Sequence, residues 1–316
     1  MPTFIETAQA LEVALKALQM YTAQHPRTLK SLEAAKLSLV DWIAEKAFLH
    51  VAVADDKVFA DGVKVVACTP HILPGLYHNT GPEIRTAVAQ LTSAINDAGI
   101  DLELVCGSDA HMTPGFVNSL ASGQILALGD TRYVLVEPPH HVLPQRLEQF
   151  FFDILVAGYI PILTHPERLT WIGGNYAAIE RLAKAGVWIQ VTAGALTGAF
   201  GRDARYWGER MLDEGIVHIL ASDAHDTKHR PPNLSKGRDA AAKRVGELEA
   251  EHLVWVRPRG VLANENPTEL AAPAARNLAV SGFDAEGGGP GAVAVHRQTA
   301  GGGGRRSGGW LRSLFE

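Results

Sequence analysis

From residue 63 onward, short runs of consecutive apolar residues alternate with longer amphipathic segments. Runs that are apolar throughout predict strands buried on both faces, and the amphipathic segments between them predict crossover helices. The predicted helices cover residues 82–98, 144–157, 175–185 and 204–214, each followed by a glycine of the kind that ends helices. The predicted strands are Val63–Cys68, Leu102–Gly107, Tyr133–Glu137, Ile160–Thr164, Val187–Thr192 and Ile216–Ala221. The pattern therefore predicts an α/β fold around a parallel sheet, either a barrel or a doubly wound sheet.

The two ends of the chain have a different pattern. Residues 1–61 show two stretches of helical spacing and then a predicted hairpin over Phe48–Ala60 around Asp55-Asp56, with no chemical motif among them. We interpret them as a small N-terminal α+β segment, separate from a main domain at residues 62–270. Residues 271–316 are glycine-rich, which predicts a disordered tail.

Composition excludes several classes of protein. With 316 residues, 47% of them hydrophobic, the chain can build a large core. A formal net charge of −5 disfavours a nucleic-acid partner, and two cysteines exclude a disulfide-stapled secreted module. The N-terminus lacks the basic start of a signal peptide, and the longest apolar stretch is too short to cross a bilayer. We therefore expect a cytoplasmic protein that is not membrane-embedded.

Histidine and aspartate residues follow four of the six predicted strands. They are His71, Asp109 with His111, His165, and Asp223 with His225. Because functional sites of parallel α/β folds form at the carboxyl ends of the strands, these residues are candidates for one site.

Imidazole and carboxylate groups together predict a metal site. These ligands suit zinc, manganese or iron, and in an Asp-x-His motif both side chains lie on one face of an extended strand end. The tetrapeptide Ser-Asp-Ala-His occurs twice, at residues 108–111 and 222–225. The sequence leaves open whether four further residues join the site or only flank it: Glu137, His140, His141 and His111.

Two arginines stand beside these motifs, Arg168 in HPER and Arg230 in SDAHDTKHRPP. Arginine binds phosphate through two parallel hydrogen bonds and keeps its charge. Arginines next to a metal site predict hydrolysis of a phosphate ester, in which metal and arginine neutralise the phosphoryl oxygens.

Six motifs occur in an order that resembles a known superfamily. They are ACTPH, GSDAH, YVLVEPPHHVLP, THPERL, QVTAGALTGAFGR and ASDAHD…RPPNL, between about Gly62 and Pro267. Together they resemble the PHP (polymerase and histidinol phosphatase) superfamily. Within it, they are most similar to the bacterial manganese-dependent protein-tyrosine phosphatases of capsular and exopolysaccharide operons.

The resemblance implies a distorted (β/α)7 barrel similar to a TIM barrel, with up to three metal ions. It also implies dephosphorylation of a phosphotyrosine protein, typically a bacterial tyrosine autokinase. Arg168 and Arg230 match the family's substrate-phosphate arginines. The residues that match its metal ligands are His71, Asp109, His165, Asp223 and His225, with Asp109 standing where many members have glutamate.

The chain departs from the family pattern at its start. Members open with a strand that ends in His-x-His and is followed by an acidic ligand, whereas no His-x-His precedes His71 here. The first βα unit of the barrel is therefore expected to be missing, and activity to be reduced. Two alternatives stay open: a PHP phosphoesterase for a small phosphate ester, or a catalytically impaired regulatory or binding homologue.

Overall fold

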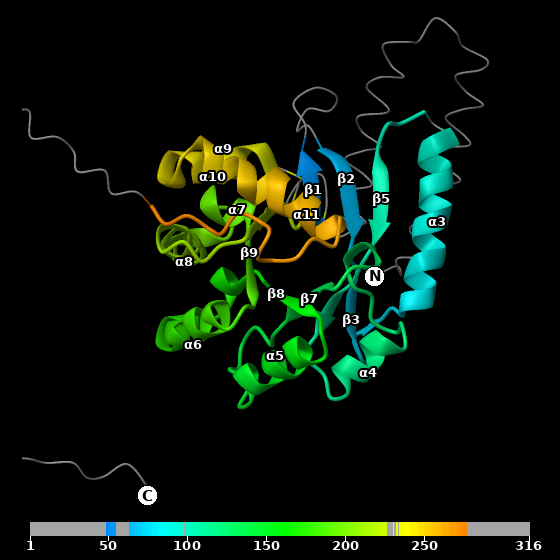
Figure 1. Ribbon diagram of the computed structural model, residues 1–316, viewed down its shortest axis with the longest axis horizontal. Helices are drawn as coiled ribbons and strands as arrows, with labels where there is room; N and C mark the ends of the chain where they lie inside the picture. Colours follow the sequence, from blue (N-terminus) through cyan, green and yellow to red (C-terminus); the bar gives the residue numbers. More distant parts are fainter. Residues whose placement is uncertain are drawn as a thin grey trace, which may run out of the picture. The chain divides into compact units, whose positions relative to one another are not determined.

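The structure is a computed structural model and describes residues 49–54, 63–97, 99–225, 230, 232 and 234–276. The helices expected before residue 48, the second half of the predicted hairpin and residues 277–316 lie outside the described residues. In the described part, the prediction of an α/β fold with a parallel sheet is confirmed (Figure 1).

Seven strands form the larger sheet, in the order β10-β9-β8-β7-β6-β3-β4. Their bounds are β3 His71–Leu73, β4 Tyr77–His78, β6 Asp109–His111, β7 Tyr133–Glu137, β8 Ile160–Thr164, β9 Trp188–Thr192 and β10 Ile219–Ala221. Neighbouring strands are parallel, except that β4 returns antiparallel to β3. Strands β7, β8 and β9 are buried at every position, as their continuous apolar runs predict.

A smaller sheet contains three strands in the order β1-β2-β5. They are β1 Leu49–Ala54, β2 Val63–Cys68 and β5 Glu103–Cys106. Strands β2 and β5 are parallel, whereas β1 is antiparallel to β2. The predicted hairpin over Phe48–Ala60 did not foresee this pairing, and residues 55–60 lie outside the described part. Strand β1 also contacts β10, at the far end of the larger sheet.

The two sheets continue into each other where β2 leads to β3 and β5 leads to β6. Cys68 of β2 pairs with Cys106 of β5. Three residues further along both segments, His71 of β3 pairs with Asp109 of β6, so the register does not change between the two sheets. A hydrogen bond from the main-chain N–H of Gly107 to the carbonyl of Cys68, 3.0 Å long, bridges the junction. Both predicted strands therefore extend beyond their apolar runs and end in polar residues.

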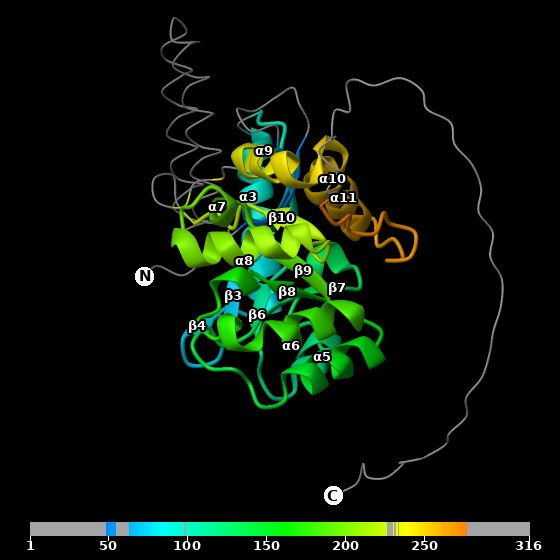
Figure 2. The same cartoon turned by 90° about the vertical axis from the view of Figure 1, so that its left-hand side faces the viewer.

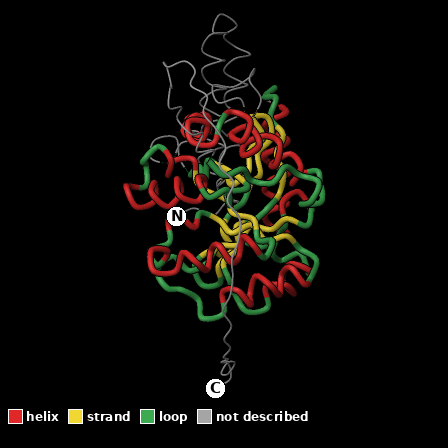
Figure 3. The backbone as a smooth tube through the Cα atoms, turned by 60° about the vertical axis from the view of Figure 1, so that its left-hand side comes forward, coloured by secondary structure: helices red, strands yellow, loops and turns green. Residues whose placement is uncertain are grey.

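The four predicted helices are confirmed, as α3 Gly81–Asp97, α5 Leu147–Val156, α6 Ile172–Lys184 and α8 Gly201–Asp213. Helix α3 packs against β5, α5 against β8 and α6 against β9, so helices surround the strands (Figure 3). None of the described helices is long and apolar enough to cross a membrane.

The pattern did not predict the remaining helices. They are α4 Phe116–Ala121, α7 Ala193–Leu196, α9 Leu234–Val245, α10 Glu247–Glu251 and α11 Arg257–Leu262, with short helices η1 Leu128–Asp130, η2 Pro166–Arg168 and η3 His252–Val256. Helices α7, α8 and α9 pack against one another (Figure 2).

Alternation along the strands divides the core into two clusters. In β7, for example, Val134 and Val136 belong to the larger cluster, while Tyr133 and Leu135 belong to the smaller one. Successive side chains of a strand point to opposite faces, so Glu137 shares its face with Tyr133 and Leu135. The smaller apolar cluster thus underlies the polar residues at the strand ends.

Helix α9 lies so close to α7 that only glycine fits at position 237. A Cβ atom on Gly237 would lie 2.4 Å from the Cβ of Ala193. We expect Gly237→Ala to lower the free energy of unfolding by about 1–3 kcal/mol through overpacking, measured by urea denaturation.

Gly174 of α6 is the matched control, because a Cβ there meets nothing within 4 Å. Gly174→Ala should be neutral or stabilise the chain by up to about 1 kcal/mol, since alanine favours helix. Equal stability of the two variants would contradict the close approach of α7 and α9.

Candidate metal centre

Polar side chains from four neighbouring strands meet at the carboxyl edge of the larger sheet. His71 of β3 pairs in register with Asp109 of β6, and His111 of β6 pairs with Glu137 of β7. His165 directly follows β8. Parallel strands present their carboxyl ends at the same edge, so residues far apart in the sequence become neighbours.

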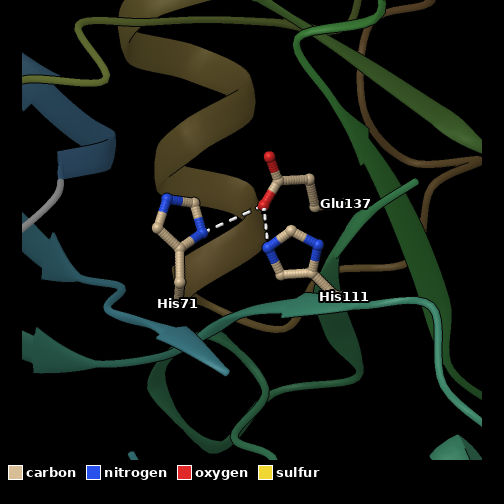
Figure 4. A group of neighbouring side chains, drawn as sticks. All are labelled: His71, His111 and Glu137. Atoms are coloured by element: carbon tan, nitrogen blue, oxygen red, sulfur yellow. Dashed lines mark ion pairs between the residues drawn. The ribbon is translucent and has the colours of Figure 1, made fainter. Parts of the chain in front are cut away.

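The carboxylate of Glu137 lies at the centre of this cluster. Its Oε2 lies 2.6 Å from Nε2 of His111 and 3.0 Å from Nδ1 of His71 (Figure 4). Its Oε1 lies 2.8 Å from Nε2 of His140 and 3.6 Å from Nε2 of His165. The side chain of Glu137 is 6% exposed, so the imidazoles take the place of the water that a charged carboxylate would otherwise bind.

Asp109 places a second buried carboxylate beside Glu137. Its Oδ2 lies 3.6 Å from Nδ1 of His71 and 3.7 Å from Nε2 of His165. The hydroxyl of Thr164 donates a hydrogen bond to Oδ1 of Asp109 at 3.3 Å. Asp109 therefore contacts imidazoles on both sides of the Glu137 carboxylate.

The charges in the cluster favour an ionised Glu137. Burial raises the pKa of Glu137, but hydrogen bonds with His111, His140 and His71 outweigh burial and hold this pKa well below its usual range. Burial lowers the pKa of His71, but its hydrogen bond to Glu137 and the charges of nearby carboxylates raise it to about 9. Burial also lowers the pKa of His165, which favours the neutral imidazole that binds metals.

Asp223 and His225 form a second group with the two arginines. Oδ2 of Asp223 accepts a hydrogen bond of 2.6 Å from Nη1 of Arg168 and another from Nη2 of Arg230. Nδ1 of His225 lies 2.9 Å from the carbonyl oxygen of Asp223, and its ring lies 6.1 Å from that of His71. The His225 ring thus connects the arginine group to the Glu137 cluster.

Phe200 contacts both guanidinium groups. Its ring centroid lies 4.5 Å from Cζ of Arg168 and 5.5 Å from Cζ of Arg230. The arginine side chains are 18% and 24% exposed, so each is held by the protein and still partly open to solvent. Two guanidinium groups fixed side by side in this way suit the binding of an oxyanion.

The backbone is strained at two of the candidate residues. His165 and Asp223 have φ values of 36° and 48°, in the left-handed region that non-glycine residues rarely adopt. Such strain costs about 1–3 kcal/mol and persists where the surrounding structure enforces it. His165 directly follows β8, and Asp223 lies two residues after the end of β10.

The structure divides the predicted ligands between the two groups. His71, Asp109 and His165 lie in the Glu137 cluster, whereas Asp223 and His225 lie with the arginines, and all five stay predictions as metal ligands. Three residues that the sequence left open lie in the centre of the cluster: Glu137, His111 and His140. His141 is exposed and outside it. One feature of the sequence could have identified Glu137 as central. It is a carboxylate at the end of an apolar run, and the strand formed by that run, β7, is buried throughout.

Two sets of side chains could hold a metal ion, and they share Glu137. One set is His71, His111 and Glu137; the other is Glu137, His140 and His165. Within each set the ligand atoms lie within 4.8 Å of one another. Imidazole nitrogen with carboxylate oxygen suits zinc, manganese and iron, so the residues present fit a divalent metal.

Comparison with known proteins identifies the family. The family described as "Capsular polysaccharide synthesis, CpsB/CapC" matches residues 50–263, which is more than half of the chain. The chain belongs to the CpsB/CapC family. The resemblance to metal-dependent tyrosine phosphatases of capsular operons is thereby confirmed.

Curated relatives and a solved structure agree with this family. The chain is 34% identical over 169 residues to the tyrosine-protein phosphatase YwqE of Bacillus subtilis, across 54% of this chain and 66% of that relative. This alignment spans just under two thirds of the relative. Identity to the tyrosine-protein phosphatase CpsB of Streptococcus pneumoniae is 24%, across 66% of this chain and 87% of that relative.

The solved structure comes from work on YwqE from Bacillus subtilis and CpsB from Streptococcus pneumoniae, described as unique metal-dependent tyrosine phosphatases. It superimposes with a TM-score of 0.63 and 29% sequence identity. The match covers 70% of this chain and 94% of that structure, so the two share a fold.

Loss of the central carboxylate should remove most of the stabilisation by divalent cations. A cation at 100 times its Kd adds about 2.7 kcal/mol to the free energy of unfolding. We expect Mn²⁺ to raise the midpoint of thermal unfolding, and Glu137→Gln to lose most of that rise because an amide is a weaker ligand than a carboxylate.

Glu148→Gln is the control, because Glu148 lies on the exposed surface of α5 in an ion pair with Arg181. This variant should keep the full rise with Mn²⁺. A rise of equal size in Glu137→Gln would show that the cation binds elsewhere.

Proposed function

We propose that this chain is a metal-dependent protein-tyrosine phosphatase that uses Mn²⁺, with Zn²⁺ and Fe²⁺ as alternatives. We place it in the cytoplasm, acting on a phosphotyrosine protein such as a bacterial tyrosine autokinase that controls capsular or exopolysaccharide synthesis. The names of its relatives support this activity. One observation carries the proposal: a buried carboxylate–imidazole cluster and two partly exposed arginines lie at the same edge of the sheet.

The metal would be held by the residues that face this edge. They are His71, Asp109, His165, Asp223 and His225, together with Glu137. When bound, a divalent cation supplies a Lewis acid that neutralises the phosphoryl oxygens and activates water.

The arginines bind the phosphoryl group. Guanidinium groups stay charged at any working pH, and Arg168 and Arg230 together offer several N–H donors to its oxygens. Asp223 holds both groups in place before substrate arrives, because its Oδ2 accepts a hydrogen bond from each. The ring of Phe200 further restricts the guanidinium groups. Their orientation therefore costs little entropy when the substrate binds.

For the architecture we propose a distorted PHP-type (β/α)7 barrel that lacks its first βα unit. The contact between β1 and β10 supports closure, because β1 is the end strand of the smaller sheet and β10 is an end strand of the larger sheet, and the two sheets continue into each other. We propose that residues 62–270 form the catalytic domain, residues 1–61 an N-terminal segment and residues 271–316 a tail. Strand β1 of that segment pairs with β2 and so packs with the catalytic domain.

Turnover of a phosphotyrosine peptide should require added Mn²⁺ and both arginines. We expect Arg230→Ala to lower kcat/KM, because it removes a donor to the phosphoryl oxygens. The decrease should correspond to a loss of about 2–4 kcal/mol of transition-state stabilisation. Bound metal, measured by elemental analysis, should be unchanged. Wild-type kinetics in Arg230→Ala would overturn its role in binding phosphate.

Two controls make the result specific. Arg181→Ala removes an exposed arginine of α6 that pairs only with Glu148 among the ion pairs of the described residues, and it should leave kcat/KM unchanged. Histidinol phosphate as substrate separates a tyrosine phosphatase from a phosphoesterase for small esters. A chain that binds metal but hydrolyses neither substrate would overturn the proposed enzyme and favour a binding protein.

A further inference from the structure

We propose that Tyr77 is a specificity-determining residue, whose ring packs against the aromatic group of an aryl phosphate ester bound at the carboxyl edge of the larger sheet. Tyr77 would thereby favour phosphotyrosine over alkyl phosphate esters such as phosphoserine. The assignment to phosphotyrosine rests on the proposed phosphatase function. The preference for an aromatic group does not, because it is measured with phosphonates that are not hydrolysed.

Tyr77 lies over two imidazoles of the Glu137 cluster. It belongs to β4, which pairs antiparallel with β3 and places Tyr77 in register with Leu73 (Figure 2). The ring centroid of Tyr77 lies 5.1 Å from that of His71 and 6.1 Å from that of His111, and the ring planes are inclined by 30° and 20°. The phenol ring therefore stacks on both imidazoles at the edge where the polar side chains meet.

The ring of His71 connects Tyr77 to the arginine group. Its centroid lies 5.1 Å from that of Tyr77 and 6.1 Å from that of His225. Nδ1 of His225 in turn lies 2.9 Å from the carbonyl oxygen of Asp223, whose carboxylate holds the two arginines. We place the phosphoryl group of a bound ester at the arginines and imidazoles, and its organic group on the Tyr77 side of the same imidazoles.

The Tyr77 ring keeps part of its surface open to a ligand. The residue is 39% exposed, whereas the side chains of His71 and His111 are 12% and 15% exposed. Leu76, the preceding residue in the turn, is also exposed and extends the apolar surface. Aromatic rings pair with one another beyond the gain from buried area, so this surface suits an aryl group better than an alkyl group.

The β3–β4 hairpin fixes the position of Tyr77. The main-chain N–H of Leu76 donates a hydrogen bond of 3.1 Å to the carbonyl of Leu73, which closes the turn. Nδ2 of Asn79 donates a hydrogen bond of 2.8 Å to the carbonyl of His71, so the chain after Tyr77 is tied to the residue that its ring contacts. A side chain that is already ordered loses little conformational entropy when a ligand binds.

A purely structural role for Tyr77 would be to shield the imidazoles of His71 and His111 from water. The two roles differ in their effect on aryl and alkyl compounds. Loss of shielding would change metal binding and would weaken the binding of both kinds of compound to the same degree. Loss of a ring contact would weaken the binding of aryl compounds alone and would leave the metal in place.

The test compares phenylphosphonate with ethylphosphonate, each titrated calorimetrically into the full Mn²⁺-loaded chain. We expect the unmodified chain to bind phenylphosphonate more tightly, and Tyr77→Ala to reduce this preference by about two- to tenfold, as the loss of one aromatic pair implies. Tyr77→Phe should keep the preference, because it keeps the ring. An unchanged preference in Tyr77→Ala, or no preference in the unmodified chain, would overturn the proposal.

Tyr206→Ala is the matched control, because Tyr206 is an exposed tyrosine of α8 whose ring packs on Trp207. It should keep the preference and the bound metal. Bound Mn²⁺ is counted by elemental analysis in every variant. Where Tyr77→Ala binds less Mn²⁺, Tyr77→Leu replaces it in the comparison, because leucine keeps an apolar side chain over the imidazoles. Loss of Mn²⁺ from both variants would assign Tyr77 to shielding and overturn the proposal.

Hydrolysis of a phosphotyrosine peptide separates this inference from the proposed function. If the preference for phenylphosphonate depends on Tyr77 but the peptide is not hydrolysed, the role of Tyr77 in binding an aryl group stands and the phosphatase fails. If the peptide is hydrolysed while Tyr77→Ala keeps the full preference, the phosphatase stands and the role of Tyr77 fails.

Discussion

Burial of the Glu137 carboxylate is the interaction on which the rest of the site depends. A charged carboxylate with 6% exposure loses most of its water, and the loss must be offset by partners inside the protein. The structure supplies ring nitrogens from three histidines within hydrogen-bonding distance and a fourth slightly beyond. This need brings together residues from strands β3 and β6, from the loop after β7 and from the end of β8. The same side chains are the ones that suit a divalent metal.

Strand register and alternation bring these partners into reach. The unbroken register from β2 and β5 into β3 and β6 places His71 beside Asp109, and the next pairing places His111 beside Glu137. Alternation points Glu137 to the same face as Tyr133 and Leu135, whose apolar cluster forms a rigid base below it. A shift of register by one residue would turn the polar ends away from each other and leave the carboxylate buried without partners.

The arginine group has a different physical basis. Asp223 is buried with a left-handed backbone, and its carboxylate accepts hydrogen bonds from Arg168 and Arg230. One buried carboxylate therefore holds two guanidinium groups side by side. Both groups are partly exposed, and His225 lies between them and the imidazoles of the Glu137 cluster. An anion bound there would meet fixed donors rather than flexible surface side chains.

The sequence by itself determined the parallel α/β fold, the main strands and helices, the family, and the edge of the sheet at which polar residues gather. These features follow from local periodicity and from motifs that lie next to strand ends. The sequence could not decide that Glu137, His111 and His140 form the centre, because their distances depend on register between strands that are far apart in the chain. It also did not predict that β1 pairs antiparallel with β2 and contacts β10. Only the tertiary structure decided these points, since strand pairing is a contact between distant segments and leaves no periodic signal in either one.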